Sequence, residues 1–175
     1  MALSSLLLLC IIAYKVWHME SKPIDFVCDR DSRRDMNTEA EMKGALEDCD
    51  FLTILPSAIQ LPCSKLHKAS WDRKSAQEKR ADLSASLAAL LGSVRVARTL
   101  SPSGCVLTQL ERLEHMVNNY LHIVTHLDIK GPVGSPVLSC TPQSTHSLST
   151  VLQTLSRLLT GKLELLMADL THVCP

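Results

Sequence analysis

Three leucine-rich stretches decide the fold, and the last of them reads LSTVLQTLSRLLTGKLELLMADL over residues 148–170. Its apolar residues recur at intervals of three and four, the spacing that places side chains on one face of an α-helix. The stripe consists of Leu148, Leu152, Leu155, Leu159, Leu166, Leu170 and Val173. This pattern predicts a helix from about residue 144 to residue 172, with the stripe in the core.

Two earlier stretches show the same spacing. One helix is expected at about residues 70–100, capped by Ser70 and stopped by Ser101-Pro102. The other is expected at about residues 104–128, before Gly131-Pro132. The two core stripes are Leu83, Leu87, Leu90, Val94 and Ala97, and Leu110, Leu113, Val117, Tyr120, Val124 and Leu127.

The connections between the helices predict how they are arranged. The link at residues 101–103 is short, so the helices on either side of it must be antiparallel. The connections at residues 50–69 and 129–143 are long, contain prolines and show no stable helix pattern, so each can cross the length of a bundle. Composition permits a first helix within residues 29–49, although no clean stripe demands it. We therefore expect an all-α, up-up-down-down, long-chain four-helix bundle with two long crossover loops.

Composition limits the function classes. The chain has 175 residues, 46% of them hydrophobic and 3% aromatic, and its net charge is zero. A general nucleic-acid binder would need a surplus of basic residues to neutralise phosphates. The six glycines form no phosphate-binding loop, and the sequence contains no hydrolase, metalloprotease or kinase motif. The sequence therefore predicts neither an enzyme nor a nucleic-acid-binding protein, and it suggests no cofactor.

The first residues and the cysteines predict secretion. The apolar run Leu6–Ala13 is too short to span a bilayer, which takes about 20 residues, and fits the core of a signal peptide. We expect cleavage within residues 17–22, which gives a signal peptide at residues 1–21 and one domain at residues 22–175. Cleavage removes Cys10 and leaves six cysteines, which in a secreted chain indicates three disulfides of several possible connectivities. We expect a soluble, extracellular monomer.

The stretch from Leu158 to Met167 followed by Cys174, the pair Cys28-Asp29 and Trp71 together resemble the erythropoietin and thrombopoietin family of helical cytokines. The resemblance covers about residues 26–174. The family pattern implies the disulfides Cys28–Cys174 and Cys49–Cys105. Cys63 and Cys140 are then left over, one in each long connection, and we expect them to form a third bridge because the two connections pass near each other.

Within the family, Cys105 at the turn into the third helix and the stretch at residues 92–98 resemble the thrombopoietin branch. The chain ends at Cys174-Pro175 without the carbohydrate-rich tail of mammalian thrombopoietins, so the resemblance is to a non-mammalian form. Thr160 and Glu164 also stand where the family pattern suggests arginines. The implied function is a hormone that binds and dimerises a single-pass class I cytokine receptor. An erythropoietin-like hormone is the main alternative, and a secreted helical lipid-binding protein is a weaker one.

Six residues are candidates for receptor contact. Lys162, Lys79 and Asp29 match family contact positions, whereas Arg33, Arg34 and Arg157 are chosen because arginine is enriched at binding hot spots. Solvated surface charges are the alternative for Lys79 and Asp29. For Lys162 the alternative is a side chain whose stem packs in the core and whose ammonium reaches the edge, since helical phase places it in the apolar arc.

Two further features have structural interpretations. We expect Trp71 to pack against the first long connection rather than to serve as an exposed anchor. His115, His122 and His126 share one face of the third helix, and the last two are four residues apart, a spacing that can hold a metal ion. That face lies opposite the apolar stripe, so we expect a solvent-exposed face, available to a second receptor contact, and no metal site.

Overall fold

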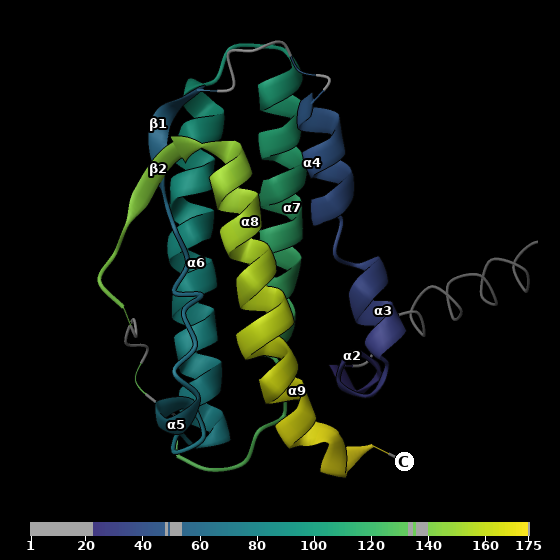
Figure 1. Ribbon diagram of the computed structural model, residues 1–175. Coiled ribbons are helices and arrows are strands. Elements are labelled where there is room, and N and C mark those ends of the chain that lie inside the picture. Colours follow the sequence, from purple (N-terminus) through teal and green to yellow (C-terminus); the bar gives the residue numbers. More distant parts are fainter. Residues whose placement is uncertain (1–22, 48, 50–53, 133–134, 136–139, 175) are drawn as a thin grey trace, which may run out of the picture.

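The computed structural model of the protein describes residues 23–47, 49, 54–132, 135 and 140–174 (Figure 1). The predicted signal peptide lies outside these residues and stays a prediction.

Among the described residues, the long helical stretches pack side by side (Figure 1). In that view α6, Ala76–Leu100, runs upward, and α7, Cys105–Thr125, runs down beside it. The last stretch descends from α8, Leu148–Leu158, through a π-helical turn η1, Leu159–Leu163, to α9, Glu164–Leu170, and a 3₁₀ turn η2, Thr171–Val173. The molecule is therefore mostly helical, as the leucine spacing predicted.

The first stretch is divided into short helices. Their bounds are α2, Pro23–Cys28; α3, Arg30–Asp35; and α4, Glu39–Glu47. The Asp29 carboxylate separates α2 from α3 and accepts hydrogen bonds from the backbone N–H groups of Asp31 and Ser32. Before α4, Asn37 Oδ1 accepts from the N–H of Glu39 at 3.2 Å. Side chains that hydrogen-bond to nearby backbone groups in this way interrupt a helix and begin a new one. A segment of several short helices does not need one continuous apolar stripe, and the sequence shows none here.

The start of α6 differs from the prediction. Ser70 belongs to a separate short helix, α5, Lys68–Trp71, where its hydroxyl donates to the carbonyl of His67. The N-cap of α6 is Ser75, which accepts from the N–H of Glu78, while the Glu78 carboxylate accepts from the N–H of Ser75. This reciprocal capping box satisfies backbone donors at the helix start, which Ser70 cannot do from five residues upstream.

The two long connections contain a small sheet that the sequence analysis did not predict. Strand β1, Ile54–Gln60, pairs antiparallel with β2, Ser144–Ser147. In β1, Leu55 and Ile59 are buried, and the N–H of Gln60 donates to Ser93 Oγ of α6. Because β2 occupies residues 144–147, the last helix begins at Leu148 and is capped by Ser147, four residues later than predicted.

The predicted stripes form the core. Every member is buried except Val173, which is 43% exposed because η2 takes it off the helical phase. Within the described part of the chain, α6 is long and apolar enough to cross a membrane by length and composition. A core helix passes the same test, and the buried stripe of α6 packs here in the cluster that also contains the α7 stripe.

Three disulfides cross-link the bundle, and each joins the cysteines that the sequence analysis paired. The Cα–Cα distances are 5.6 Å for Cys28–Cys174, 5.9 Å for Cys49–Cys105 and 5.6 Å for Cys63–Cys140. The third bridge and the β1–β2 pairing hold the two long connections together. The connections are thus attached to each other as well as to the helices.

The capping box gives a stability prediction. Replacing Ser75→Ala should lower the free energy of unfolding by about 1 kcal/mol, because it removes a cap from the start of a core helix. Ser70→Ala, which removes an exposed hydroxyl from α5, should change it by less than about 0.5 kcal/mol. Urea unfolding followed by circular dichroism measures both. An equal or larger loss for Ser70→Ala would show that α6 is capped differently in solution.

Candidate functional site

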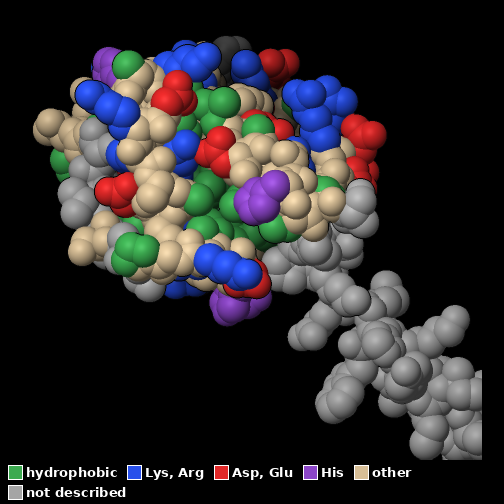
Figure 2. Space-filling view, turned by 90° about the horizontal axis from the view of Figure 1, so that it is seen from below, with side chains coloured by type: hydrophobic (Ala, Val, Ile, Leu, Met, Phe, Trp, Pro, Cys, Tyr) green, Lys and Arg blue, Asp and Glu red, His purple; other side chains and the backbone are tan. Residues whose placement is uncertain are grey.

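The six candidate contact residues fall into two sets. Three are buried, at 8%, 6% and 2% exposure respectively: Arg33, Lys79 and Lys162. The other three are exposed: Asp29, Arg34 and Arg157. Around the end of the bundle seen in Figure 2, basic and acidic side chains are intermingled about hydrophobic ones, in keeping with the zero net charge.

Lys162 takes part in a buried ion pair. Its Nζ lies 3.0 Å from Asp82 Oδ2 of α6, and both side chains are 2% exposed. Lys74 approaches the same oxygen at 3.2 Å and is 30% exposed. The ammonium of Lys162 does not reach the edge of the bundle, so the alternative with an exposed head was wrong. In this conformation Lys162 offers no charge to a partner.

Trp71 lies at the centre of this cluster. The Trp71 side chain is 3% exposed, so it is buried and does not serve as an exposed anchor. The Nζ atoms of Lys74, Lys79 and Lys162 are 5.5, 5.8 and 5.4 Å from its ring centroid, within range for cation–π attraction. Lys79 Nζ also lies 2.7 Å from Asp169 Oδ2 of α9. The cluster therefore joins α5, α6 and the last helical stretch.

Burial determines the electrostatics of the cluster. Loss of hydration lowers the pKa of Lys162 below its ordinary value, and the hydrogen bond to Asp82 offsets only part of this effect. Asp82 Oδ1 and Trp71 Nε1 are buried without a hydrogen-bond partner among the described residues. Charges that are removed from water in this way stabilise a fold only as a matched set, so loss of one member is costly.

Arg33 holds the first helical stretch to the last. Its Nε and Nη2 donate to the two carboxylate oxygens of Glu164, each at 2.8 Å. Its Nη1 donates to the backbone carbonyls of Phe26 and Val27 at 2.8 and 2.9 Å. The hydrogen bonds from Arg33 lower the pKa of Glu164 below its ordinary value. Such a bidentate pair fixes geometry as well as charge.

Tyr120 of α7 completes this contact. Its hydroxyl donates to the backbone carbonyl of Arg33 at 3.3 Å, and its ring meets that of Phe26 edge to face with centroids 6.1 Å apart. Burial raises the pKa of Tyr120. Arg33 thus contacts α2, α7 and α9 and has the geometry of a structural residue.

The exposed candidates lie on the outer side of the first and last stretches. Asp29 caps α3, and its hydrogen bonds from Ser32 and Asp31 lower the pKa of its carboxyl. Arg34 makes a loose pair with Asp31 at 3.5 Å, in which both side chains are mostly exposed. These two residues are accessible to a partner.

Arg157 of α8 lines a pocket of about 490 Å³ between α8 and the two long connections. The Cys63–Cys140 disulfide forms part of its wall, together with Lys65, Gln153 and Thr154. The lining contains two cations and, among the described residues, no carboxylate. This pocket suits an acidic group on a partner.

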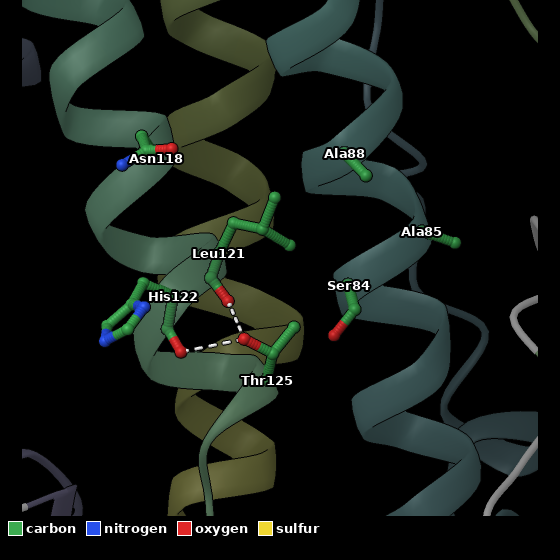
Figure 3. Close-up of a pocket in the computed structure, with 7 residues that line it drawn as sticks. All are labelled: Ser84, Ala85, Ala88, Asn118, Leu121, His122 and Thr125. Atoms are coloured by element: carbon green, nitrogen blue, oxygen red, sulfur yellow. Dashed lines mark hydrogen bonds between the residues drawn. The ribbon is translucent and has the colours of Figure 1, made fainter.

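The histidine face of α7 is exposed, as predicted. Figure 3 shows the His122 ring directed away from α6, whereas Leu121 and Thr125 face a shallow groove between α7 and α6. Within the described ranges, no group of three or more His, Cys, Asp or Glu side chains is arranged to hold a metal ion.

The sequence analysis missed the acidic partners Asp82, Glu164 and Asp169. Asp82 lies four residues before Ser86 and eight before Leu90 of the apolar stripe, and this helical spacing on the buried side of α6 was the one available signal. Glu164 was noted only as a departure from the family pattern. Its pairing with Arg33 joins residues 131 positions apart, and no local spacing reveals such a contact.

Asp82 tests the buried cluster. Asp82→Asn should lower the free energy of unfolding by about 3–5 kcal/mol, because it removes the negative charge that faces a buried ammonium. Asp169→Asn, at a pair whose carboxylate side chain is 44% exposed, should cost about 1 kcal/mol or less. Urea unfolding at pH 7 compares the two variants. Equal losses would contradict the assignment of Lys162 and Asp82 to the interior.

Glu164 tests the acid sensitivity. Because its folded-state pKa lies below the reference value of 4.5, its pair with Arg33 stabilises the protein above that pH. This stabilisation is lost as the pH falls through the folded-state pKa. Glu164→Gln should cost about 2 kcal/mol at pH 7 and should flatten the fall in stability as the pH drops below about 4.5.

The matched control is Glu41→Gln, at a pair with Arg112 whose carboxylate side chain is 71% exposed. Chemical unfolding at several pH values should show the wild-type profile for this variant. If Glu164→Gln also shows the wild-type dependence of stability on pH, the Arg33–Glu164 pair does not determine the acid stability.

Comparison with known proteins agrees with the mostly helical fold. The model of the family described as erythropoietin/thrombopoietin matches residues 26–175, which include the six paired cysteines and the described helices from within α2 to η2. No curated protein matches the chain. The chain therefore belongs to the erythropoietin/thrombopoietin family, whose members are haematopoietic cytokines and not enzymes.

Proposed function

We propose that the protein is a secreted, monomeric hormone that brings together two copies of a class I cytokine receptor of the thrombopoietin-receptor type. The associated cytoplasmic kinases would then activate STAT proteins and promote thrombocyte production. The observation that carries the choice of branch is the Cys49–Cys105 bridge, which ties the end of the first helical stretch to the start of α7. Three disulfides also suit an oxidising, extracellular compartment.

A first receptor face is proposed on α8, α3 and the first long connection. Its exposed cations include Arg157, Lys65 and Arg34. Arg157 and Lys65 share a pocket whose lining has no carboxylate among the described residues, so an acidic receptor loop is the complementary partner. Arginine side chains in such a setting commonly dominate binding energy.

A second receptor face is proposed on α4 and α7, where Arg112 and Glu41 lie exposed 3.7 Å apart. Two faces on different sides of one rigid bundle can hold two receptor chains at a fixed separation. The mechanism is then geometric, since activation depends on where the two receptors are placed and requires no chemical step by the hormone.

The buried candidates have an indirect role in this proposal. Lys162 and Lys79 anchor the last helical stretch to α6, and Arg33 anchors it to α3. These pairs fix the relative positions of the elements that present the first face. Substitutions at these positions are therefore expected to act through stability and shape.

The first face is tested by charge reversal. Arg157→Glu and Arg34→Glu should each raise the concentration for half-maximal STAT phosphorylation by about fivefold or more, because loss of a hot-spot arginine commonly costs more than about 1 kcal/mol. Their free energies of unfolding should stay within about 0.5 kcal/mol of the wild type, since both side chains are exposed. Lys130→Glu, an exposed cation after α7, is the matched control and should signal normally.

The choice of receptor is tested with two cell lines, one bearing the thrombopoietin receptor of the matching species and the other its erythropoietin receptor. A response only in the first supports the proposal. A response only in the second assigns the chain to the erythropoietin branch. Silence in both from a folded, oxidised protein contradicts the hormone proposal and favours a secreted binding protein, such as a lipid carrier.

A further inference from the structure

The last turn of α7 carries two exposed histidines, His122 and His126, one helical turn apart. Their ring centroids lie 4.2 Å apart, with 38° between the ring planes. Imidazole nitrogens bind zinc at about 2.0–2.1 Å, so two rings this close can reach one ion through small side-chain rotations. His115, the third histidine on this helix, lies two turns from His122.

The hydrogen bond of His126 leaves its Nε2 free to bind a metal. Its Nδ1 lies 2.7 Å from the backbone carbonyl of His122, and a carbonyl oxygen can only accept. Nδ1 therefore carries the hydrogen, and in the neutral ring the lone pair is on Nε2. Histidine ligands in metal sites commonly donate their other N–H to a backbone carbonyl in this way, which fixes the tautomer and the ring orientation.

The surroundings favour a cation. His122 lies in the last turn of α7, and His126 is its C-cap, so both rings lie at the negative end of the helix dipole. Both side chains are exposed, and the ring of His122 points away from α6 and from Leu121 and Thr125 (Figure 3). The open side of the pair is thus accessible to an ion and to the water that completes its coordination.

From these observations we propose that His122 and His126 form a two-imidazole surface site for a first-row divalent transition-metal ion, such as Zn²⁺ or Cu²⁺. Imidazole suits both ions, and Cu²⁺ should bind more tightly. Since the described residues offer no group of three ligands here, water completes the coordination and the site is open. The sequence analysis expected no metal site, and the ring contact and the Nδ1 hydrogen bond are what the structure adds.

The test uses the oxidised chain without an affinity tag and titrates ZnCl₂ by calorimetry in a buffer that does not chelate metals. One ion per chain should bind. His122→Asn and His126→Asn should each weaken binding by at least about tenfold, because loss of an outer hydrogen bond alone costs 10–100-fold at metal sites. His115→Asn, also exposed on α7, is the matched control and should change the affinity by less than about twofold.

Two readouts extend the test. Excess Zn²⁺ should raise the Tm of the wild type and of His115→Asn by similar amounts, and should raise the Tm of the other two variants by clearly less. In the unsubstituted protein, Zn²⁺ should protect His122 and His126 from a histidine-modifying reagent, as read by mass spectrometry. No protection, or equal affinity in all variants, would overturn the proposal whatever the receptor assays show.

Discussion

The position of the first helical stretch depends on its links to the rest of the bundle, chief among them the bidentate pair between Arg33 and Glu164. Isolated helices as short as α2, α3 and α4 are not stable in water. Arg33 also binds the carbonyls of Phe26 and Val27, and its own carbonyl accepts from Tyr120. Together with the disulfides at Cys28 and Cys49, this one side chain makes three short helices act as one element of a bundle.

Charge has a mostly internal role in this protein. Lys162, Lys79 and Arg33 each face a carboxylate from a distant part of the chain, and two of them lie near the ring of Trp71. Only the Lys162–Asp82 pair is buried on both sides, whereas Asp169 and Glu164 are partly exposed. A buried pair adds little net stability over hydrophobic packing, but it penalises any arrangement that separates its members. We infer that the three pairs fix how the last helical stretch sits on α6 and α3.

The sequence was most informative where one periodic signal controls the outcome. The stripes through Leu90, Val117 and Leu155 are buried as predicted. Apolar residues at every third or fourth position can all be buried together only on one face of a helix. The start of α6 was harder to predict because Ser70 and Ser75 are both possible N-caps. Only Ser75 has a glutamate, Glu78, three residues later, as a capping box requires. The β1–β2 pairing and the Lys162–Asp82 contact depend on tertiary proximity, which no local pattern encodes.

The three disulfides have a consequence for how the molecule survives cleavage. Cys28–Cys174 closes the chain into a ring, and the other two bridges cross that ring. A protease that cuts the connection between Cys49 and Cys63 leaves two pieces joined by Cys28–Cys174 and Cys49–Cys105. A cut between Cys105 and Cys140 leaves them joined by Cys28–Cys174 and Cys63–Cys140. A chain cut once at either of these places would therefore keep its two pieces linked, and they would separate only after reduction.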